Sequence, residues 1–221
     1  MNNILSYKEP KSVIAEQYRN IRTSIQYSNL DKKLKTILVT SSTKNEGKTI
    51  TTTNLAVNFA AIDKKKVLII DCDLRNPSIH KEFGITNVGG LTDLLIEKNN
   101  IENYIKTTEI DNLHVLTSGL IPPNPSEILE SKVMEDLLNN LKEMYDYIFI
   151  DTPPIGIVMD AGTLANKVDA SILVVKSNGV EFKQLEETKR KLDAVNANII
   201  GVVLNAYKSE KDNNYYYAYY E

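Results

Sequence analysis

The sequence has little of several features that define whole classes of protein. It contains 1 cysteine, Cys72, so no disulfide can form within the chain, and its 2 histidines, His80 and His114, stand apart and indicate no metal cluster. No apolar run approaches the roughly 18 residues that a membrane-spanning helix needs. The N-terminus also lacks the charged-then-apolar form of a secretory signal. We therefore expect a cytoplasmic protein whose contact with any membrane comes through a partner.

The chain also lacks a large excess of either positive or negative charge. The chain of 221 residues has 26 Lys and Arg against 29 Asp and Glu, a formal net charge of −3. A dedicated nucleic-acid binder would carry a strongly basic face, so we expect no nucleic-acid partner. With 42% hydrophobic and 25% charged residues, the composition is that of a globular domain large enough to bury a substantial core.

Aromatic residues are distributed unevenly. The chain has no tryptophan and 4 phenylalanines but 12 tyrosines, and several of these crowd into the last residues of the chain: Tyr215, Tyr216, Tyr217, Tyr219 and Tyr220. Residues 208–221 show no helical or strand period before these tyrosines, so we expect a flexible tail. Tyrosines on a terminal tail do not contribute to the hydrophobic core, so this cluster needs a functional explanation.

Short apolar runs alternate with longer amphipathic segments between about residues 36 and 205. The runs are almost continuously apolar, which predicts strands covered on both faces, as in a parallel sheet. They lie at 36–40, 67–70, 113–116, 147–150, 170–175 and 199–204, with helices expected at 48–62, 126–143, 160–167 and 181–195. This pattern predicts an α/β fold with helices on both faces of a mostly parallel sheet. An amphipathic helix over 10–27, with Val13, Ile14, Ile21 and Ile25 among its apolar positions, is expected before the first strand.

The first expected strand leads into Ser41-Ser42-Thr43-Lys44-Asn45-Glu46-Gly47-Lys48-Thr49 and then a helix. The ending Gly-Lys-Thr is what a phosphate-binding P-loop requires, because Lys48 neutralises phosphate charge and the Thr49 hydroxyl ligates Mg²⁺. Ser42 replaces the usual first glycine, and Asn45 stands where many such loops have another; asparagine tolerates positive φ better than other non-glycine residues. An accidental Gly-Lys-Thr in an ordinary turn is the alternative. The expected nucleotide contacts are Thr43, Lys44, Asn45, Glu46, Gly47, Lys48, Thr49 and Ile50.

Carboxylates follow two of the expected strands. One strand delivers Asp71 and Asp73, and another delivers Asp151. Ligands of open α/β sheets bind beyond the carboxyl ends of the strands, so these three side chains can converge near the phosphates held by Lys48. Oxygen ligands of this kind suit Mg²⁺. A lone Asp after a strand is often only a helix cap, but that explanation fits poorly for two matched strand ends beside a P-loop.

The motifs resemble those of a known family. Three apolar residues followed by Asp71-x-Asp73-x-Arg75, and three followed by Asp151-x-x-Pro154, resemble the Walker A′ and Walker B motifs of the bacterial tyrosine kinases. The P-loop is similar to their Walker A motif, with Lys44-Asn45 in place of the usual Pro-Gly. Segments 74–80 and 119–127 are also similar to family members, so the resemblance extends over essentially the whole chain.

The resemblance implies a P-loop tyrosine kinase domain over 1–207 and a tyrosine-cluster tail over 208–221. It implies ATP and Mg²⁺ as cofactors, catalytic roles for Lys48, Asp71, Asp73 and Asp151, and metal ligation by Thr49, Asp71 and Asp151. Asp71 is the expected acceptor of the tyrosine proton and Asp73 supports the metal or the geometry, although the two roles could be exchanged. Asn205 resembles a residue that contacts the nucleotide base in related P-loop ATPases.

Self-association is also implied. Glu16-x-x-Arg19-x-x-Arg22 resembles the helix, here at about 10–27, with which family members form homo-oligomeric rings. Neighbouring subunits would then phosphorylate Tyr215, Tyr216, Tyr217, Tyr219 and Tyr220. The implied partners are a membrane activator of polysaccharide co-polymerase type and a cognate tyrosine phosphatase. The implied role is control of capsule or exopolysaccharide synthesis and export at the inner face of the membrane.

Other readings remain open. Glu16 and Arg19 also form an ordinary solvated helix pair. A positioning or partitioning ATPase of the MinD/ParA type would share the P-loop core, but such proteins carry a second lysine five positions before the P-loop lysine, where this chain has Thr43. A nucleotide-binding adaptor without catalytic activity is a third possibility. Cys72 is expected to be a small buried residue and no nucleophile.

Overall fold

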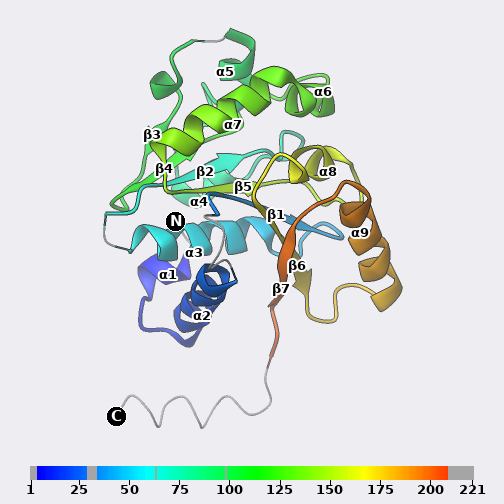
Figure 1. Ribbon diagram of the computed structural model, residues 1–221. Helices are drawn as coiled ribbons and strands as arrows, with labels where there is room; N and C mark the ends of the chain where they lie inside the picture. The colour runs from blue at the N-terminus through cyan, green and yellow to red at the C-terminus, as the bar shows by residue number, and fades with distance from the viewer. Residues whose placement is uncertain (1–3, 29–33, 63, 98, 209–221) are drawn as a thin grey trace.

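The computed structural model describes residues 4–28, 34–62, 64–97 and 99–208 (Figure 1). Within these residues a 7-stranded sheet has the order β3–β4–β2–β5–β1–β6–β7. Neighbouring strands are parallel except for β3 and β4, which are antiparallel. The strands are β1 (Thr36–Ser41), β2 (Val67–Asp71), β3 (Lys106–Thr107), β4 (Leu113–Leu116), β5 (Tyr147–Asp151), β6 (Ala170–Lys176) and β7 (Ile199–Asn205). The predicted α/β fold with a mostly parallel sheet is confirmed.

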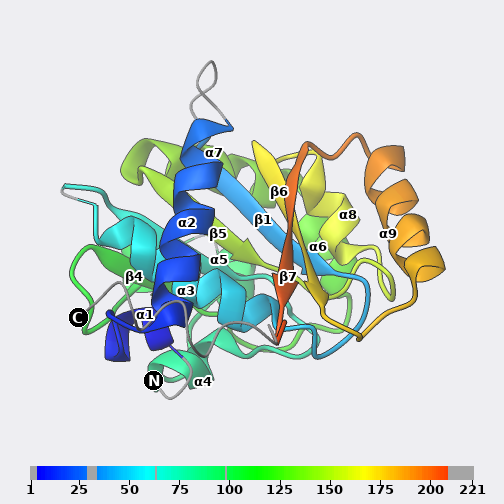
Figure 2. The same ribbon diagram turned by 90° about the horizontal axis from the view of Figure 1, so that it is seen from below.

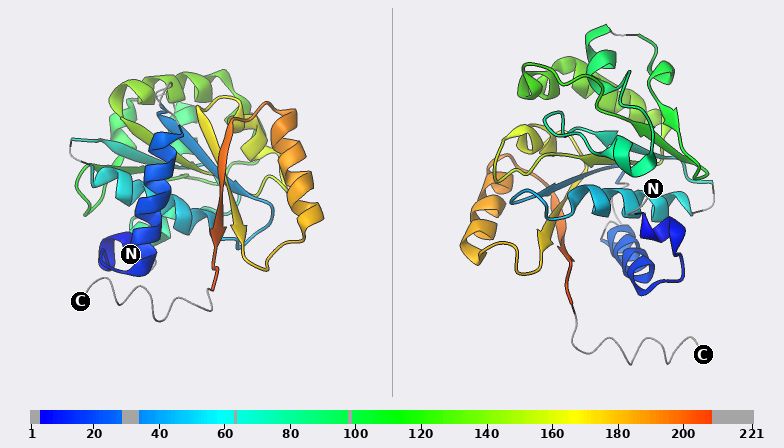
Figure 3. Two further views of the ribbon diagram at one scale, coloured as in Figure 1. Left: turned by 60° about the horizontal axis from the view of Figure 1, so that its bottom comes forward. Right: turned by 180° about the vertical axis from the view of Figure 1, so that it is seen from behind.

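Helices cover both faces of the sheet (Figures 1 and 3). One face packs against α2 (Val13–Tyr27), α3 (Lys48–Ala60) and α4 (Ile79–Phe83), and α1 (Leu5–Lys8) packs on α2 and α3. The other packs against α5 (Leu91–Glu97), α6 (Pro125–Glu130), α7 (Lys132–Met144), α8 (Asp160–Ala165) and α9 (Phe182–Ala194), with a short 3₁₀ helix, η1 (Ile101–Asn103), beyond α5. Because the central strands are covered twice, every residue of β1 and β2 is buried, which explains their continuous apolar sequences.

The single helix expected over 126–143 is wrong: the structure has two helices there, separated at Ser131. Ser131 has the extended backbone angles φ −56° and ψ 151°. Its hydroxyl donates to the carbonyl oxygen of Ile128 at 2.7 Å and accepts from the N–H of Met134 at 3.2 Å. The side chain therefore closes α6 and caps α7, a role that serine and threonine often take at helix starts.

Other differences concern short elements and helix ends. The helix expected from residue 10 begins at Val13, because the Ser12 hydroxyl accepts the N–H of Ala15 at 3.2 Å and acts as its N-cap. Val13 and Ile14 are 39% and 49% exposed, so the apolar positions of this helix do not all face the core. Elements α1, α4, α5 and β3 have too few residues to show a period in the sequence.

Strand β7 forms one edge of the sheet beside α2, as Figure 2 shows from below. In the part of the chain that the structure describes, no helix is long and apolar enough to cross a membrane. Residues 209–221, which include all five clustered tyrosines, lie outside the described residues, so the expectation of a flexible tail stays a prediction.

Candidate active site

The P-loop joins β1 to α3 at the carboxyl edge of the sheet. Asn45 has φ 62° and Gly47 has φ 96°, so both adopt the left-handed conformation. The expectation that Asn45 substitutes for a glycine with positive φ is confirmed. Gly47 is the N-cap of α3, so the free N–H groups of the first helical turn and the helix dipole are directed at the loop. This arrangement suits a bound phosphate group.

Glu46 anchors the loop from inside. It is buried, and its carboxylate accepts the backbone N–H and the hydroxyl of Thr43 within the loop and, at 3.1 Å, the N–H of Lys176 at the end of β6. At the loop tip Lys44 and Asn45 are exposed, while Thr43 and Ile50 are half-buried. Of the expected nucleotide contacts, Glu46 is therefore a structural brace in this structure, and its side chain faces the protein.

Asn205 lies against the same loop although it is far away in sequence. Its side-chain amide donates to the carbonyl oxygen of Glu46 at 2.9 Å. A Cβ atom on Gly47 would lie 2.0 Å from the Asn205 amide nitrogen and would displace this side chain, and φ 96° independently favours glycine at 47. The structure thus brings the end of β7 to the P-loop, while contact of Asn205 with a nucleotide base stays a prediction.

Lys48 and Thr49, in the first turn of α3, meet the end of β5. Lys48 is buried in this region. The Thr49 hydroxyl donates to Oδ2 of Asp151 at 2.6 Å, and the Thr52 hydroxyl lies 3.2 Å from Oδ1 of the same carboxylate. The convergence of the P-loop with the carboxylate at the end of β5 is therefore present as the sequence predicts.

Asp71 and Asp151 end two neighbouring strands, β2 and β5, and are paired in register. Both are fully buried. Burial raises the pKa of Asp151 to about 6. Burial, with the nearby Asp151 carboxylate as a second cause, raises the pKa of Asp71 well above its usual range. Two carboxyl groups held in this way favour a cation between or beside them.

The two aspartates of the Walker A′ segment differ in their surroundings. Asp71 uses both oxygens for backbone N–H groups: Oδ2 accepts from Ser78 and Ile79, each at 3.0 Å, and Oδ1 from Asp73 at 3.2 Å. Asp73 is 8% exposed and accepts the N–H of Asn76 at 3.0 Å through Oδ1. Burial raises the pKa of Asp73 as well. Asp71 thus holds the loop after β2 through its backbone N–H groups, while Asp73 is slightly more exposed.

These oxygen atoms fit Mg²⁺, a hard cation that prefers carboxylate and hydroxyl ligands and keeps several waters. Thr49, Asp71 and Asp151 supply such oxygens from adjoining positions. Among the described residues, no three or more His, Cys, Asp and Glu side chains gather into a complete metal-binding group. An ion at this site therefore depends on phosphate and water oxygens for its remaining ligands.

Sequence reasoning missed two groups at the site. The Ser78 hydroxyl lies 2.9 Å from that of Thr49. Arg75 holds Asp160 through two hydrogen bonds, Nε to Oδ2 at 2.8 Å and Nη2 to Oδ1 at 3.1 Å, and Ser126 donates to the same carboxylate at 2.7 Å. Although burial opposes it, these partners hold the pKa of Asp160 below its usual range. Arg75 stands in the motif, but nothing in the sequence pointed to Asp160.

The residues expected to mediate self-association have partners within the chain. Arg19 forms an ion pair with Glu16 and donates to the carbonyl oxygen of Pro10 at 2.7 Å. Arg22 donates to the carbonyl oxygen of Asn58 on α3 at 2.9 Å. All three side chains are half-buried, and their contact with a neighbouring subunit stays a prediction.

The fold and the site define a P-loop nucleotide-binding protein, and comparison with known proteins narrows this class. A family model described as an AAA domain matches residues 34–199. Tyrosine-protein kinase YwqD of Bacillus subtilis is 42% identical over 97% of this chain and 90% of its own length. The putative tyrosine-protein kinase CapB of Staphylococcus aureus is 39% identical over 97% of this chain and 94% of its own.

Solved structures are also similar to this chain. The kinase domain of the Escherichia coli tyrosine kinase ETK has a TM-score of 0.90 at 31% identity, covering 96% of this chain and 83% of that one. The septum site-determining protein MinD of Pyrococcus horikoshii, solved with Mg-ADP, has a TM-score of 0.66 at 27% identity over 80% and 72% of the two chains. The chain belongs to the bacterial tyrosine kinases, and it is a tyrosine-protein kinase that shares its nucleotide-binding fold with MinD.

Proposed function

We propose that this kinase transfers the γ-phosphoryl group of Mg-ATP to the clustered C-terminal tyrosines of neighbouring copies of the chain. The observation that carries the proposal is the convergence of Lys48, Thr49 and Asp151 beside the Walker A′ aspartates at one edge of the sheet. The acceptors proposed are Tyr215, Tyr216, Tyr217, Tyr219 and Tyr220, which lie outside the described residues.

In this proposal the P-loop positions the phosphates. Lys48 and the N–H groups of the first turn of α3 bind the β- and γ-phosphates and offset their negative charge. Thr49 and Asp151, with Asp71 on the neighbouring strand, would hold Mg²⁺, which would neutralise charge on the phosphate oxygens when bound. Because phosphoryl transfer depends mainly on positioning and charge neutralisation, this set of side chains suffices for the chemistry.

A carboxylate accepts the proton of the attacking tyrosine. The tyrosine oxygen forms a bond to the γ-phosphorus, the bond from that phosphorus to the β–γ bridging oxygen breaks, and ADP leaves. The sequence favours Asp71 as the base, although its role and that of Asp73 could be exchanged. The surroundings support Asp73, because it is 8% exposed, whereas Asp71 is fully buried and accepts backbone N–H groups through both of its carboxylate oxygens. Asp71 then acts as the residue that shapes the loop and supports the metal.

Phosphorylation of the tail has an electrostatic consequence. Each phosphate adds about −1.5 to −2 charges at neutral pH. Several on adjacent tyrosines repel one another and the carboxylates of the site. In the proposed ring, in which Glu16, Arg19 and Arg22 of α2 contact the next subunit, phosphorylation expels the tails and loosens the assembly. Size-exclusion chromatography tests this, because equal elution volumes before and after full phosphorylation contradict it.

The cellular setting proposed follows from the family resemblance. A membrane protein of polysaccharide co-polymerase type activates the kinase and holds it at the inner face of the membrane. A cognate phosphatase reverses the modification, and the pair controls capsule or exopolysaccharide production. Co-purification of the kinase with such a membrane protein, lost on deletion of that protein's cytoplasmic tail, tests this arrangement.

The decisive experiment maps phosphotyrosine by mass spectrometry after incubation with Mg-ATP. We expect label within residues 215–220 and none in Lys48→Met, which lacks the phosphate-binding cation. ATP hydrolysis without labelled protein would favour a positioning ATPase of the MinD type. Nucleotide binding without hydrolysis and without labelled protein would favour an adaptor. Label that survives deletion of 209–221 would contradict the proposed acceptors.

A mixing experiment separates transfer between subunits from transfer within one. Lys48→Met with an intact tail is the acceptor, and an active chain with its five tail tyrosines changed to phenylalanine is the enzyme. Label on the Lys48→Met chain supports transfer to a neighbour. Absence of label in the mixture, with the wild type labelled alone, would contradict it.

A further inference from the structure

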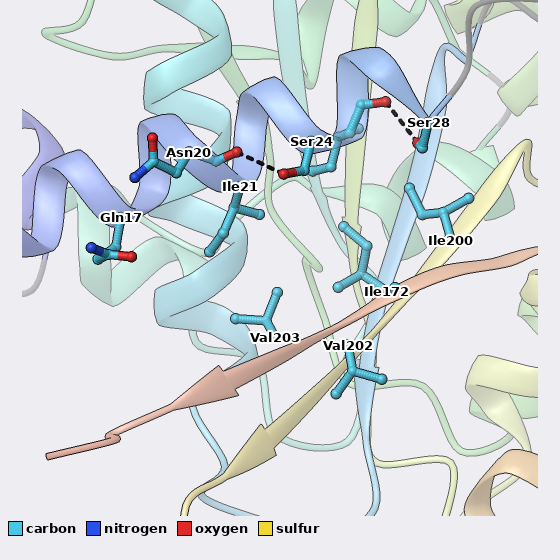
Figure 4. Close-up of a pocket in the computed structure, with 11 residues that line it drawn as sticks. Gln17, Asn20, Ile21, Ser24, Ser28, Ile172, Ile200, Val202 and Val203 are labelled. Atoms are coloured by element: carbon cyan, nitrogen blue, oxygen red, sulfur yellow. Dashed lines mark hydrogen bonds between the residues drawn. The ribbon is translucent and has the colours of Figure 1, made fainter. Parts of the chain in front are cut away.

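A groove of about 240 Å³ runs between α2 and the edge strand β7 (Figure 4). Its floor is apolar and includes Ile21, Ile172, Ile200 and Val203. Its rim on α2 carries neutral polar side chains, among them Asn20, Ser24 and Ser28, which share one helix face because they are spaced by four residues. None of the described residues that line the groove is charged.

The groove adjoins an open strand edge. Of the described strands, β7 pairs with β6 alone. It is 7 residues long, and Val202, at the groove, is 58% exposed. Proteins usually cover or interrupt such an edge, because its unpaired backbone groups accept another extended segment. The shape therefore suits an extended peptide lying along β7 with side chains in the groove.

We propose that the occupant is the C-terminal segment of the same chain, with Tyr215–Tyr220 lying antiparallel to β7. The strand ends at Asn205, and Ala206 has φ 55°, a left-handed conformation that turns the chain as soon as β7 ends. Residues 209–214 read Ser-Glu-Lys-Asp-Asn-Asn, of which the serine, the aspartate and the asparagines favour turns. Residues 215–220, extended at about 3.4 Å each, span about 20 Å, which matches the length of β7.

The chemistry of the groove matches tyrosine. An unmodified tyrosine has an apolar ring for the isoleucine and valine floor and a hydroxyl for the amide and hydroxyl groups of α2. Phosphotyrosine carries about −1.5 to −2 charges and finds no cation among the described residues of the groove. Burying that charge unpaired is unfavourable, so the groove admits the unmodified segment and rejects the phosphorylated one.

Docking there withholds the acceptors from the phosphate site. Asn205 contacts the P-loop at one end of β7, and Ile200, in the groove, lies about 16 Å back along the strand at roughly 3.3 Å per residue. A docked tyrosine is thus held away from Lys48, and a phosphorylated tail does not return. This regulatory consequence rests on the proposed function, whereas the docking itself does not.

Hydrogen–deuterium exchange of the full chain without nucleotide tests the docking. In the wild type we expect the backbone amides of 215–220 to exchange about tenfold more slowly than an unprotected peptide, as for a docked state populated about ten to one. Ser24→Trp fills the groove and abolishes this protection. Thr23→Trp is the matched control, because both hydroxyls bond the carbonyl four residues earlier, but only Ser24 lines the groove.

A second variant fills the groove from β7, in case Ser24→Trp removes the protection by disturbing α2. A Cβ atom at Gly201 meets no atom within 4 Å, so Gly201→Phe fits on β7 and also fills the groove. We expect it to remove the protection, as full phosphorylation of the tail does.

Unprotected tail amides in the wild type, or equal protection in Ser24→Trp and Thr23→Trp, would overturn the proposal. Protection that disappears on dilution would overturn the same-chain occupant in favour of a second copy. The exchange measurements are made without nucleotide, so they test the docking even if the chain does not phosphorylate itself.

Discussion

The hydroxyl of Thr49 donates a hydrogen bond to Asp151 over 2.6 Å, which joins the first turn of α3 to the last residue of β5. A hydroxyl has one proton, so Ser78 must be the donor in its 2.9 Å contact with Thr49. The backbone N–H of Ser78 in turn bonds Asp71. The P-loop, β5 and the loop after β2 therefore meet at one small cluster of oxygen atoms, and changes there affect stability and metal binding together.

Asp151→Asn is expected to stabilise the chain in the absence of metal and nucleotide. Burial raises the pKa of Asp151 to about 6, so the folded state resists its ionisation more than the unfolded state does. Folding stability thus falls as pH rises from about 4 to 6, and the full penalty is present above that window. At pH 8 we expect Asp151→Asn to gain on the order of 2 kcal/mol in urea unfolding while losing kinase activity. Exposed Asp193→Asn is the control, and a destabilised Asp151→Asn would contradict the explanation.

Metal affinity is expected to fall in acid. A carboxyl group binds Mg²⁺ only when ionised, and burial places the pKa of Asp151 near 6. The affinity for Mg²⁺ in the presence of ADP should be constant above about pH 7 and fall about tenfold per pH unit well below pH 6. Isothermal titration calorimetry measures this directly. An unchanged affinity at pH 5 would show that Asp151 does not ligate the ion.

Arg75 is expected to set the geometry of the site through Asp160. Asp160 is fully buried while the Arg75 side chain is 43% exposed, so removing the guanidinium leaves a buried carboxylate with Ser126 as its remaining side-chain donor. We expect Arg75→Ala to cost about 1–3 kcal/mol of stability and to lower kcat with little change in the KM for ATP, because the P-loop is intact. Arg75→Lys should restore part of the stability but not the two-bond geometry.

The matched control for this arginine is Arg190→Ala. Arg190 pairs with Glu186 on the exposed face of α9 at 3.8 Å, and such pairs contribute little. Equal effects of the two substitutions on kcat would show that the Asp160 contact plays no positioning role.

Gly156→Ala is expected to disturb the P-loop at Ser42, where the loop begins. A Cβ atom at 156 would lie 2.0 Å from the carbonyl oxygen of Ser42, and neither backbone can move freely. We expect a loss of about 1–3 kcal/mol in stability and at least tenfold weaker nucleotide binding in a fluorescence titration. Gly201→Ala, where the new atom meets nothing within 4 Å, should leave both unchanged. Normal nucleotide affinity in Gly156→Ala would contradict this account.

Much of the site could be predicted from the sequence because its signals are local. Asn45 could replace glycine because positive φ is a property of one residue, and the structure has it at 62°. Asp71 and Asp151 follow apolar strands, and the carboxyl ends of parallel strands meet at one edge of a sheet. The break at Ser131 was missed because the hydrophobic period continues across it.

Individual hydrogen bonds between side chains of distant loops could not be predicted in this way. Arg75 and Asp160 are 85 positions apart, and Asn205 and Glu46 are 159 apart. The resemblance places Asn205 near the nucleotide, but no period or motif predicts its hydrogen bond to Glu46 or that of Arg75 to Asp160. Their meeting depends on the order of the strands in the sheet and on the packing of the loops at its edge.

The cluster of tyrosines, the P-loop and the paired carboxylates were determined by the sequence alone, because each is defined by residue type and short spacing. The tertiary structure decided that Asp71 is fully buried while Asp73 is 8% exposed, that Arg75 bonds Asp160 of α8, and that β7 leaves an open edge beside α2. These relations arise from packing and strand order, which bring together side chains that no local rule connects.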